Sequence, residues 1–183
     1  MQFKHAPSAV SVLFDDPNLV SAAGLVPMLR LAQAAGLASL AQQRLSVPTD
    51  KGANAGAKVS ALVAGMLAGA DSIDDMNLLR HGGMDRLFDR VYAPPSTLGS
   101  FLRCFQFGHV RQLDAVASRF LQNLTGCAPP LLQAGADGMV MVDLDDTIIE
   151  VHGYDKQGAG FGYSGVRGLN ALLATASTSS SAP

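Results

Sequence analysis

The chain has 183 residues, of which 48% are hydrophobic and 15% are charged, and its formal net charge is −2. This length and apolar content predict a buried core, in one domain or in one domain plus part of a second. The weakly acidic total excludes a strongly basic nucleic-acid-binding chain, although charge at one part of the chain can still serve that purpose.

The cysteines and histidines bear on redox chemistry and on zinc binding. Cys104 and Cys127 form no C-x-x-C pair, and neither a signal peptide nor an apolar run of about 18 residues is present. We therefore predict a cytoplasmic protein without a membrane span, in which both thiols pack within helices. The four His residues lack the helical H-x-x-x-H spacing, which argues against a zinc site.

The first two thirds of the chain have helical periodicity. Segments 25–35 and 37–45 are rich in Ala and Leu, and a helix that begins at Lys58 carries Val59, Leu62, Val63, Met66 and Leu67 on one face. The sequence from Ser72 to Asp75 resembles a capping box and predicts a short helix through Arg80, ended by Gly82 and Gly83.

Two further helices follow. Residues 94–97 are a second helix start signal. We predict that the helix ends at Gly108 and that one of its faces carries Leu98, Phe101, Leu102 and Phe105. The spacing of apolar residues from Val110 to Leu124 predicts another amphipathic helix, closed by Gly126 and the prolines at 129 and 130.

After Gly135 the pattern changes to that of strands. Residues 138–142 and 147–153 are predicted strands, a glycine-rich stretch covers 158–165, and 169–174 is either a third strand or a short helix. The Ser/Thr-rich segment 175–183 is predicted not to pack. A two-stranded hairpin is only marginally stable, so we interpret this part of the chain as an incomplete sheet.

The segment 140–149 carries the strongest chemical signal. An apolar strand leads into a cluster of carboxylates, and because strand side chains alternate, Asp143, Asp145 and Thr147 share one face. Two carboxylates at one rim favour a hard divalent cation such as Mg²⁺. Asp137 and Asp146 are interpreted as solvated or turn residues, and His109 and His152 as packed or exposed side chains.

The order D-x-D-x-T at 143–147 resembles the opening signature of haloacid-dehalogenase-like phosphatases. That resemblance implies Asp143 as the nucleophile, Asp145 as the acid/base and Mg²⁺ as the cofactor. The later part of the sequence departs from the family, because it holds a single Lys, Lys156, and no further acidic pair.

A wider set of segments resembles bacterial insertion-sequence transposases of the DDE type. The resemblance covers roughly residues 19–175 and rests on segments 73–80, 93–103, 142–147 and 158–163. It implies an all-helical region that binds terminal inverted repeats of DNA, followed by a ribonuclease-H-like catalytic domain. It also implies Mg²⁺ held by Asp145, with Asp143 as the second choice, together with a second Asp and a Glu from later elements. Glu150, the one Glu of the chain, lies too close to the first strand to be that residue.

Arginines in the middle of the chain supply candidate DNA contacts. Six Arg stand against three Asp between Arg80 and Phe120, whereas Asp137 to Asp155 holds six acids and no base. The segment 96–106 is either a recognition helix or an ordinary amphipathic helix with a solvated Arg face. As a recognition helix it places Arg103 and Arg111 near DNA, and Ser96 and Thr97 at the cap where backbone amides meet phosphate.

From these observations we predict a helical N-terminal region followed by a truncated α/β domain of two to three strands. Residues 1–135 form the helical DNA-binding region, 136–176 begin the catalytic domain, and 177–183 form a disordered tail. The resemblance implies a truncated transposase that is inactive as an enzyme, with DNA as its partner and a homodimer as an option. The alternatives are a haloacid-dehalogenase-like phosphatase and a non-enzymatic DNA-binding regulator.

Overall fold

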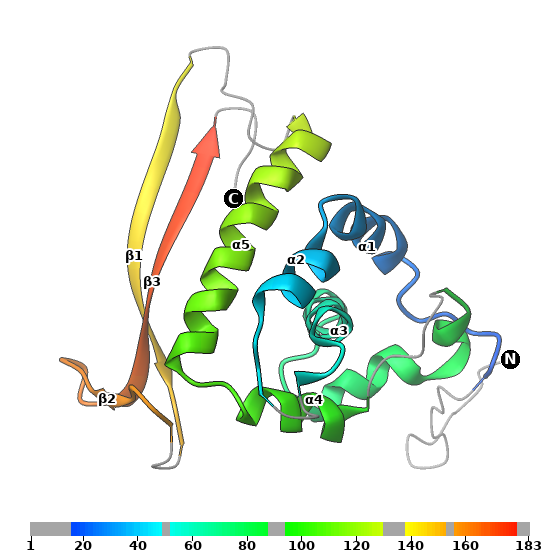
Figure 1. Cartoon of the computed structure of the whole chain (residues 1–183), viewed down its shortest axis with the longest axis horizontal. Helices are drawn as coiled ribbons and strands as arrows, with labels where there is room; N and C mark the ends of the chain where they lie inside the picture. The colour runs from blue at the N-terminus through cyan, green and yellow to red at the C-terminus, as the bar shows by residue number, and fades with distance from the viewer. Residues whose placement is uncertain (1–15, 49–51, 88–93, 130–137, 153–155, 179–183) are drawn as a thin grey trace, which may run out of the picture. The chain divides into compact units, whose positions relative to one another are not determined.

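The computed structural model describes residues 16–48, 52–87, 94–129, 138–152 and 156–178, and the chain divides into two compact units. The first unit comprises residues 1–105 and the second 106–183. Helices and a small three-stranded antiparallel sheet make up the described residues, a mixed α/β fold (Figure 1). No helix among these residues is long and apolar enough to cross a membrane.

The first unit begins with two short helices that the sequence predicted. Helix α1 spans Leu25–Ala34 and α2 spans Leu37–Arg44. Gly36 joins them with a φ of 80°, a left-handed conformation that glycine adopts without steric cost. This glycine therefore lowers the cost of the turn between the helices instead of disrupting them.

Helix α3 spans Ala55–Leu67 and lies very close to α2. A Cβ placed on Gly56 would stand 2.2 Å from the carbonyl oxygen of Ala38, and the Gly56 amide donates to Oε1 of Gln42 at 3.2 Å. Small side chains make up much of the buried side of α3: Ala55, Gly56, Ala61, Ala64 and Gly65. The interhelical contact thus depends on backbone approach more than on large side chains.

The predicted apolar face of α3 was wrong in part. The helix starts at Ala55, before the predicted start at Lys58, and Val59 and Leu62 are buried as expected. Met66, however, is 68% exposed and Leu67 is exposed as well. Close packing against α2 selects the side of α3 with the smallest side chains, so the stripe of largest residues is not the buried one.

Two short 3₁₀ helices follow, η3 at Asp74–Arg80 and η4 at Gly82–Leu87. The predicted capping interaction at Ser72 is present: its amide and hydroxyl donate to Oδ2 of Asp75 at 3.0 and 2.5 Å, and its Oγ accepts the Asp75 amide at 3.4 Å. Helix η4 contacts the residues before α1. Gly83 donates its amide to the Leu19 carbonyl at 2.7 Å, and Arg86 donates to Oδ1 of Asn18 at 2.9 Å.

Helix α4 spans Pro95–Arg103 and inserts its apolar side into the core of the first unit. Leu98 and Phe101 are fully buried, and Nζ of Lys58 lies 5.2 Å from the centroid of the Phe101 ring. Phe105 lies beyond the helix and meets Phe101 edge to face at 5.0 Å. The helix ends at Arg103, so the prediction that Gly108 ends it was wrong, and Leu102 is exposed.

The second unit begins with α5, which spans Phe107–Cys127. Gln106 and His109 form a reciprocal cap at its start, in which the backbone N–H of Gln106 donates to Nδ1 of His109 at 3.0 Å. Gly108 is therefore inside the first turn of α5, and Gly126 is inside its last turn. The division between the units falls before this helix.

The sheet of the second unit has the strand order β1-β3-β2 and is antiparallel throughout (Figure 1). Strand β1 spans Val140–Glu150, β2 spans Gly160–Phe161 and β3 spans Arg167–Thr178. The strands predicted at 138–142 and 147–153 are one continuous strand, because β1 pairs with β3 through the carboxylate cluster from Val140 opposite Thr178 to Glu150 opposite Gly168.

The structure also settles the end of the described chain. Residues 169–174 are strand and not helix, and β3 continues to Thr178, so the first residues of the predicted tail are paired with β1. Residues 179–183 and the predicted turn residue Asp137 lie outside the described residues.

Both faces of this sheet carry exposed apolar side chains. On one face Leu144 is 66% and Leu172 is 72% exposed; on the other Met141 is 64% and Leu173 is 50% exposed. A sheet with apolar residues on both faces is the kind that α/β proteins cover with helices on both sides. Among the described residues, β1 and β3 do not bury these side chains.

Candidate functional site

The two candidate metal-binding aspartates lie in the middle of β1. Asp143 is opposite Thr175 and Asp145 is opposite Leu173 on β3, which places both carboxylates on the face that also carries Thr147. Both side chains are exposed. As predicted, the two aspartates lie on one face of the strand. The prediction that they lie at the end of the strand was wrong, because β1 continues to Glu150.

Local hydrogen bonds distinguish the three aspartates of this cluster. Asp145 accepts the backbone amide of Asp146 on its Oδ1 at 2.9 Å. Asp146 points to the opposite face and accepts a hydrogen bond from Nδ2 of Asn170 at 3.1 Å. Asp146 was interpreted as a solvated or turn residue: its side chain is exposed, as expected, but it lies within a strand and not in a turn, with a cross-strand partner 24 positions away.

The described residues contain no group of three or more His, Cys, Asp or Glu close enough to hold a metal ion. Asp143 and Asp145 can each offer carboxylate oxygen to a hard cation, and Mg²⁺ is commonly bound by one or two carboxylates with water and phosphate completing its shell. Glu150 lies at the far end of β1, opposite Gly168, on the face of Asp146. The donor set of β1 thus fits part of a magnesium site.

Helix α4 presents three of the four candidate DNA-binding residues. Ser96 and Thr97 occupy its first turn and Arg103 is its last residue, and all three are exposed. Ser96, Ser100 and Arg103 follow the i, i+4, i+7 spacing of one helix face, and Arg103 donates to Oγ of Ser100 at 3.3 Å. This polar face is separate from the buried positions of Leu98 and Phe101.

The start of α4 has limited capacity for an anion. Pro95 has no amide hydrogen, and the Thr97 amide donates to the Pro94 carbonyl at 2.9 Å. The Ser96 amide and the two hydroxyls remain as the donors of this turn. A phosphate would therefore meet fewer backbone donors here than at a helix start without proline.

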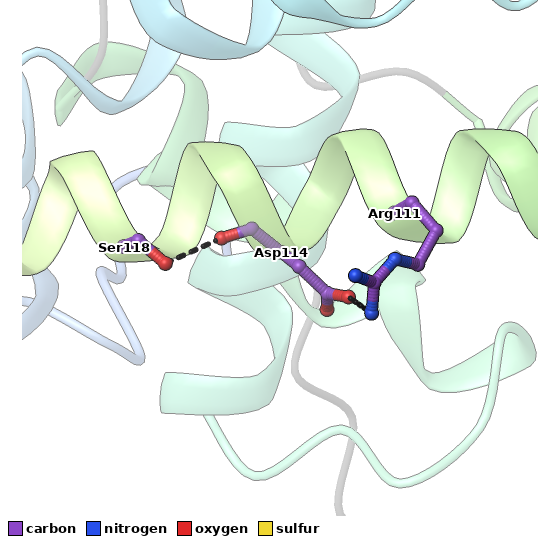
Figure 2. A network of polar contacts seen from close by, with 3 residues as sticks. All are labelled: Arg111, Asp114 and Ser118. Atoms are coloured by element: carbon purple, nitrogen blue, oxygen red, sulfur yellow. Dashed lines mark hydrogen bonds and ion pairs between the residues drawn. The ribbon is translucent and has the colours of Figure 1, made fainter.

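The fourth candidate, Arg111, belongs to α5 in the second unit, so it is described with that helix and not with Arg103. Figure 2 shows its guanidinium beside Asp114, with Nη1 and Oδ2 3.5 Å apart. Both side chains are largely exposed, and the Asp114 carbonyl accepts the Ser118 hydroxyl at 2.9 Å. Asp114 therefore partly neutralises the charge that Arg111 would offer to DNA.

Sequence reasoning missed two polar interactions near these residues. The role of His109 as a helix cap was not predicted, although a residue three positions after a polar cap residue is the standard place for such a partner. The bond between Asn170 and Asp146 had no local signal, because it depends on the register of β1 against β3.

Comparison with known proteins adds no relative to these observations: no family model, curated protein or solved structure matches the chain.

Proposed function

We propose that this chain is the DNA-binding part of a DDE-type transposase together with the opening strands of its ribonuclease-H-like catalytic domain. The observation that carries the proposal is the position of Asp143 and Asp145 on one face of a strand whose sheet has exposed apolar side chains on both sides. A strand of this kind is suited to the centre of a larger covered sheet, where a catalytic carboxylate is held rigidly.

In this proposal Asp145 is the first catalytic carboxylate, with Asp143 beside it. Magnesium held by these carboxylates would supply the activation of a water or a 3′-hydroxyl for attack on phosphate. The residues of β1 would bind the metal and fix its position relative to the sheet. A second Asp and a Glu must complete the site, and the carboxylates of one strand cannot replace them.

We therefore expect no strand cleavage or joining by this chain alone. The test incubates the purified protein and Mg²⁺ with a labelled DNA duplex carrying a terminal inverted repeat. Nicked or joined products that disappear in the Asp145→Ala variant would contradict the expectation. Products that persist in that variant would indicate a contaminating nuclease.

DNA binding is proposed through the polar face of α4 and through Arg111. Each arginine that neutralises a phosphate releases a counterion, so binding should weaken steeply as salt rises. The logarithm of the binding constant should fall with the logarithm of salt concentration by about 0.9 per phosphate contact. Arg103→Ala and Arg111→Ala should each reduce that slope by about one.

Two variants sharpen this experiment, which uses a labelled duplex and fluorescence anisotropy. Asp114→Ala removes the carboxylate beside Arg111 and should strengthen binding at low salt. Arg30→Ala removes an exposed arginine of α1 that is outside the proposed interface and should leave binding unchanged. Absence of binding at low salt, or equal losses in all the arginine variants, would refute the proposed interface.

A phosphatase of the haloacid-dehalogenase type is the second candidate. The order of Asp143, Asp145 and Thr147 on one face of β1 favours it, with Asp143 as nucleophile and Asp145 as acid/base. Hydrolysis of a generic phosphomonoester that is lost in Asp143→Ala would support it. A non-enzymatic regulator that competes with an intact transposase for its repeats is distinguished by DNA binding without either activity.

A further inference from the structure

Strand β1 forms one edge of the described sheet, and its backbone offers hydrogen bonds away from β3. Val151 donates its amide to the Arg167 carbonyl at 3.1 Å, which continues the register of Glu150 opposite Gly168. Opposed pairs in an antiparallel ladder alternate between bonded and non-bonded. The odd-numbered residues of β1 therefore bond to β3, and the even-numbered residues from Val140 to Glu150 direct their amides and carbonyls outward.

One of these outward amides already has a hydrogen-bond acceptor within β1. The Asp146 amide donates to Oδ1 of Asp145 at 2.9 Å, which agrees with the assignment of even-numbered groups to the open edge. A cationic side chain placed beside Asp145 would compete for this carboxylate. Release of the carboxylate would return the Asp146 amide to the edge for a ladder hydrogen bond.

The two faces beside this edge differ in chemistry. One face carries Asp143 and Asp145, both exposed. The other carries Val142 and Leu144, which are exposed and apolar, and Asp146, whose carboxylate is bonded to Asn170. A complementary strand would therefore present cations on the first face and apolar side chains on the second.

Charge disfavours self-pairing of β1 in its central registers. Antiparallel self-pairing centred on Leu144, Asp145 or Asp146 would place Asp143 opposite Asp145, Asp145 opposite itself, or Asp146 opposite itself. Like charges directly opposite are destabilising in a sheet. The strands of this sheet offer a single base, Arg167, against the four acids of β1.

We propose that the open edge of β1 binds an extended segment of another protein in which Lys or Arg alternates with apolar residues, and which adds to the sheet as a further strand. Main-chain hydrogen bonds to the even-numbered residues give affinity, and the alternating side chains give specificity. The cations lie beside Asp143 and Asp145, and the apolar side chains beside Val142 and Leu144. This inference goes beyond the proposed DNA binding and does not depend on it; the pairing of Asp143 and Asp145 with cationic side chains would compete with the metal binding proposed above.

The test measures binding of a short fluorescein-labelled peptide that alternates Lys and Val to the full chain, by fluorescence anisotropy at low salt. A peptide that alternates Glu and Val is the matched probe. We expect the Lys peptide to bind roughly tenfold more tightly than the Glu peptide, since two cross-strand ion pairs are replaced by two repulsions. Equal binding of the two peptides would overturn the proposal.

Two proline variants locate the edge. Leu144→Pro removes an outward amide of β1, and Leu172→Pro removes an amide of β3 that, by the same alternation, faces away from β1; the two leucines share a face and have similar exposure. Leu144→Pro should weaken binding of the Lys peptide at least tenfold, whereas Leu172→Pro should leave it within about twofold. Equal effects of the two variants would refute docking on β1.

A charge-reversal variant keeps the proposal falsifiable if a proline disrupts the sheet, which circular dichroism would reveal. The double variant Asp143→Lys and Asp145→Lys should prefer the Glu peptide over the Lys peptide. An unchanged preference would overturn the proposal. If the chain self-associates and the Lys peptide cannot bind to the associated form, the proposal would also be overturned, because a second copy of the chain would then be the partner of β1.

Discussion

At the scale of single residues, aspartate serves different structural purposes along this chain. Asp75 holds the start of η3 through Ser72, and Asp146 joins β1 to β3 through Asn170. Asp145 instead covers an amide of its own strand, and Asp114 pairs with Arg111 within α5. The acidic residues therefore cannot be read as one cluster of ligands, because several are committed to backbone or side-chain partners.

The contact between Ser72 and Asp75 predicts a pH dependence of stability. The hydrogen bond from the Ser72 hydroxyl lowers the pKa of Asp75 below its ordinary value of 3.8, with a further contribution from Asp71. A carboxyl with a lowered pKa in the folded state stabilises the fold when it is ionised. Its contribution is fully present above pH 3.8 and is lost as the pH falls through the lower folded value.

We expect Ser72→Ala to lower the melting temperature at neutral pH, and the difference from the unsubstituted protein to shrink below pH 3.8. Thermal denaturation, followed by circular dichroism at several pH values, measures this difference in melting temperature. Asp74→Asn changes a charge on the same turn without removing the Ser72 contact and should have a smaller effect. A Ser72→Ala difference that is constant with pH would show that the carboxylate plays no part.

At the scale of elements, the approach of α3 to α2 depends on one glycine. Because a Cβ on Gly56 would lie 2.2 Å from the Ala38 carbonyl oxygen, Gly56→Ala must push the helices apart. We expect a loss of about 1–3 kcal/mol in the free energy of unfolding. Gly108→Ala in α5, where nothing lies within 4 Å of the added atom, should be neutral or stabilising by up to about 1 kcal/mol.

Chemical denaturation of both variants makes this comparison. Equal stability changes at the two positions would mean that helix propensity, and not the contact between α2 and α3, governs the response to alanine.

Elements with strong local signals were predictable, and those shaped by partners were not. Helices α1 and α2 were predicted from their Ala and Leu content, and α4 and α5 from apolar periodicity with start or stop signals within each segment. The buried side of α3 depends on α2, so its own stripe of large residues was misleading. The apolar run before the aspartates predicted a strand that ends at the carboxylate cluster, yet pairing with β3 continues the strand through the cluster.

The candidate site shows the same limit. Alternation within one strand was enough to place Asp143 and Asp145 on a common face, because it needs only local geometry. The bond between Asn170 and Asp146 requires the register of two distant segments. The pairing of Arg111 with Asp114 has a local signal, because residues three apart on a helix are neighbours.

At the scale of the whole molecule, buried apolar side chains are distributed unequally between the two units. The described core residues lie between Leu25 and Phe101, except for Val116 and Val151. The helices α2, α3 and α4 thus hold side chains that are protected from water, whereas β1 and β3 hold a long ladder with both faces exposed. Apolar burial is the main source of stability, so the first unit should resist opening better than the sheet.

Hydrogen exchange followed by mass spectrometry tests this difference in one experiment on the full chain. Peptides from α3 should exchange markedly more slowly than peptides from β1 and β3, because opening the sheet exposes little additional apolar surface while opening α3 exposes the core. Gly56→Ala should speed exchange in α3 and leave the sheet unchanged. Protection of β1 equal to that of α3 would show that the sheet is stabilised by contacts beyond its own strands, and the exposure of its two faces would no longer support an added layer.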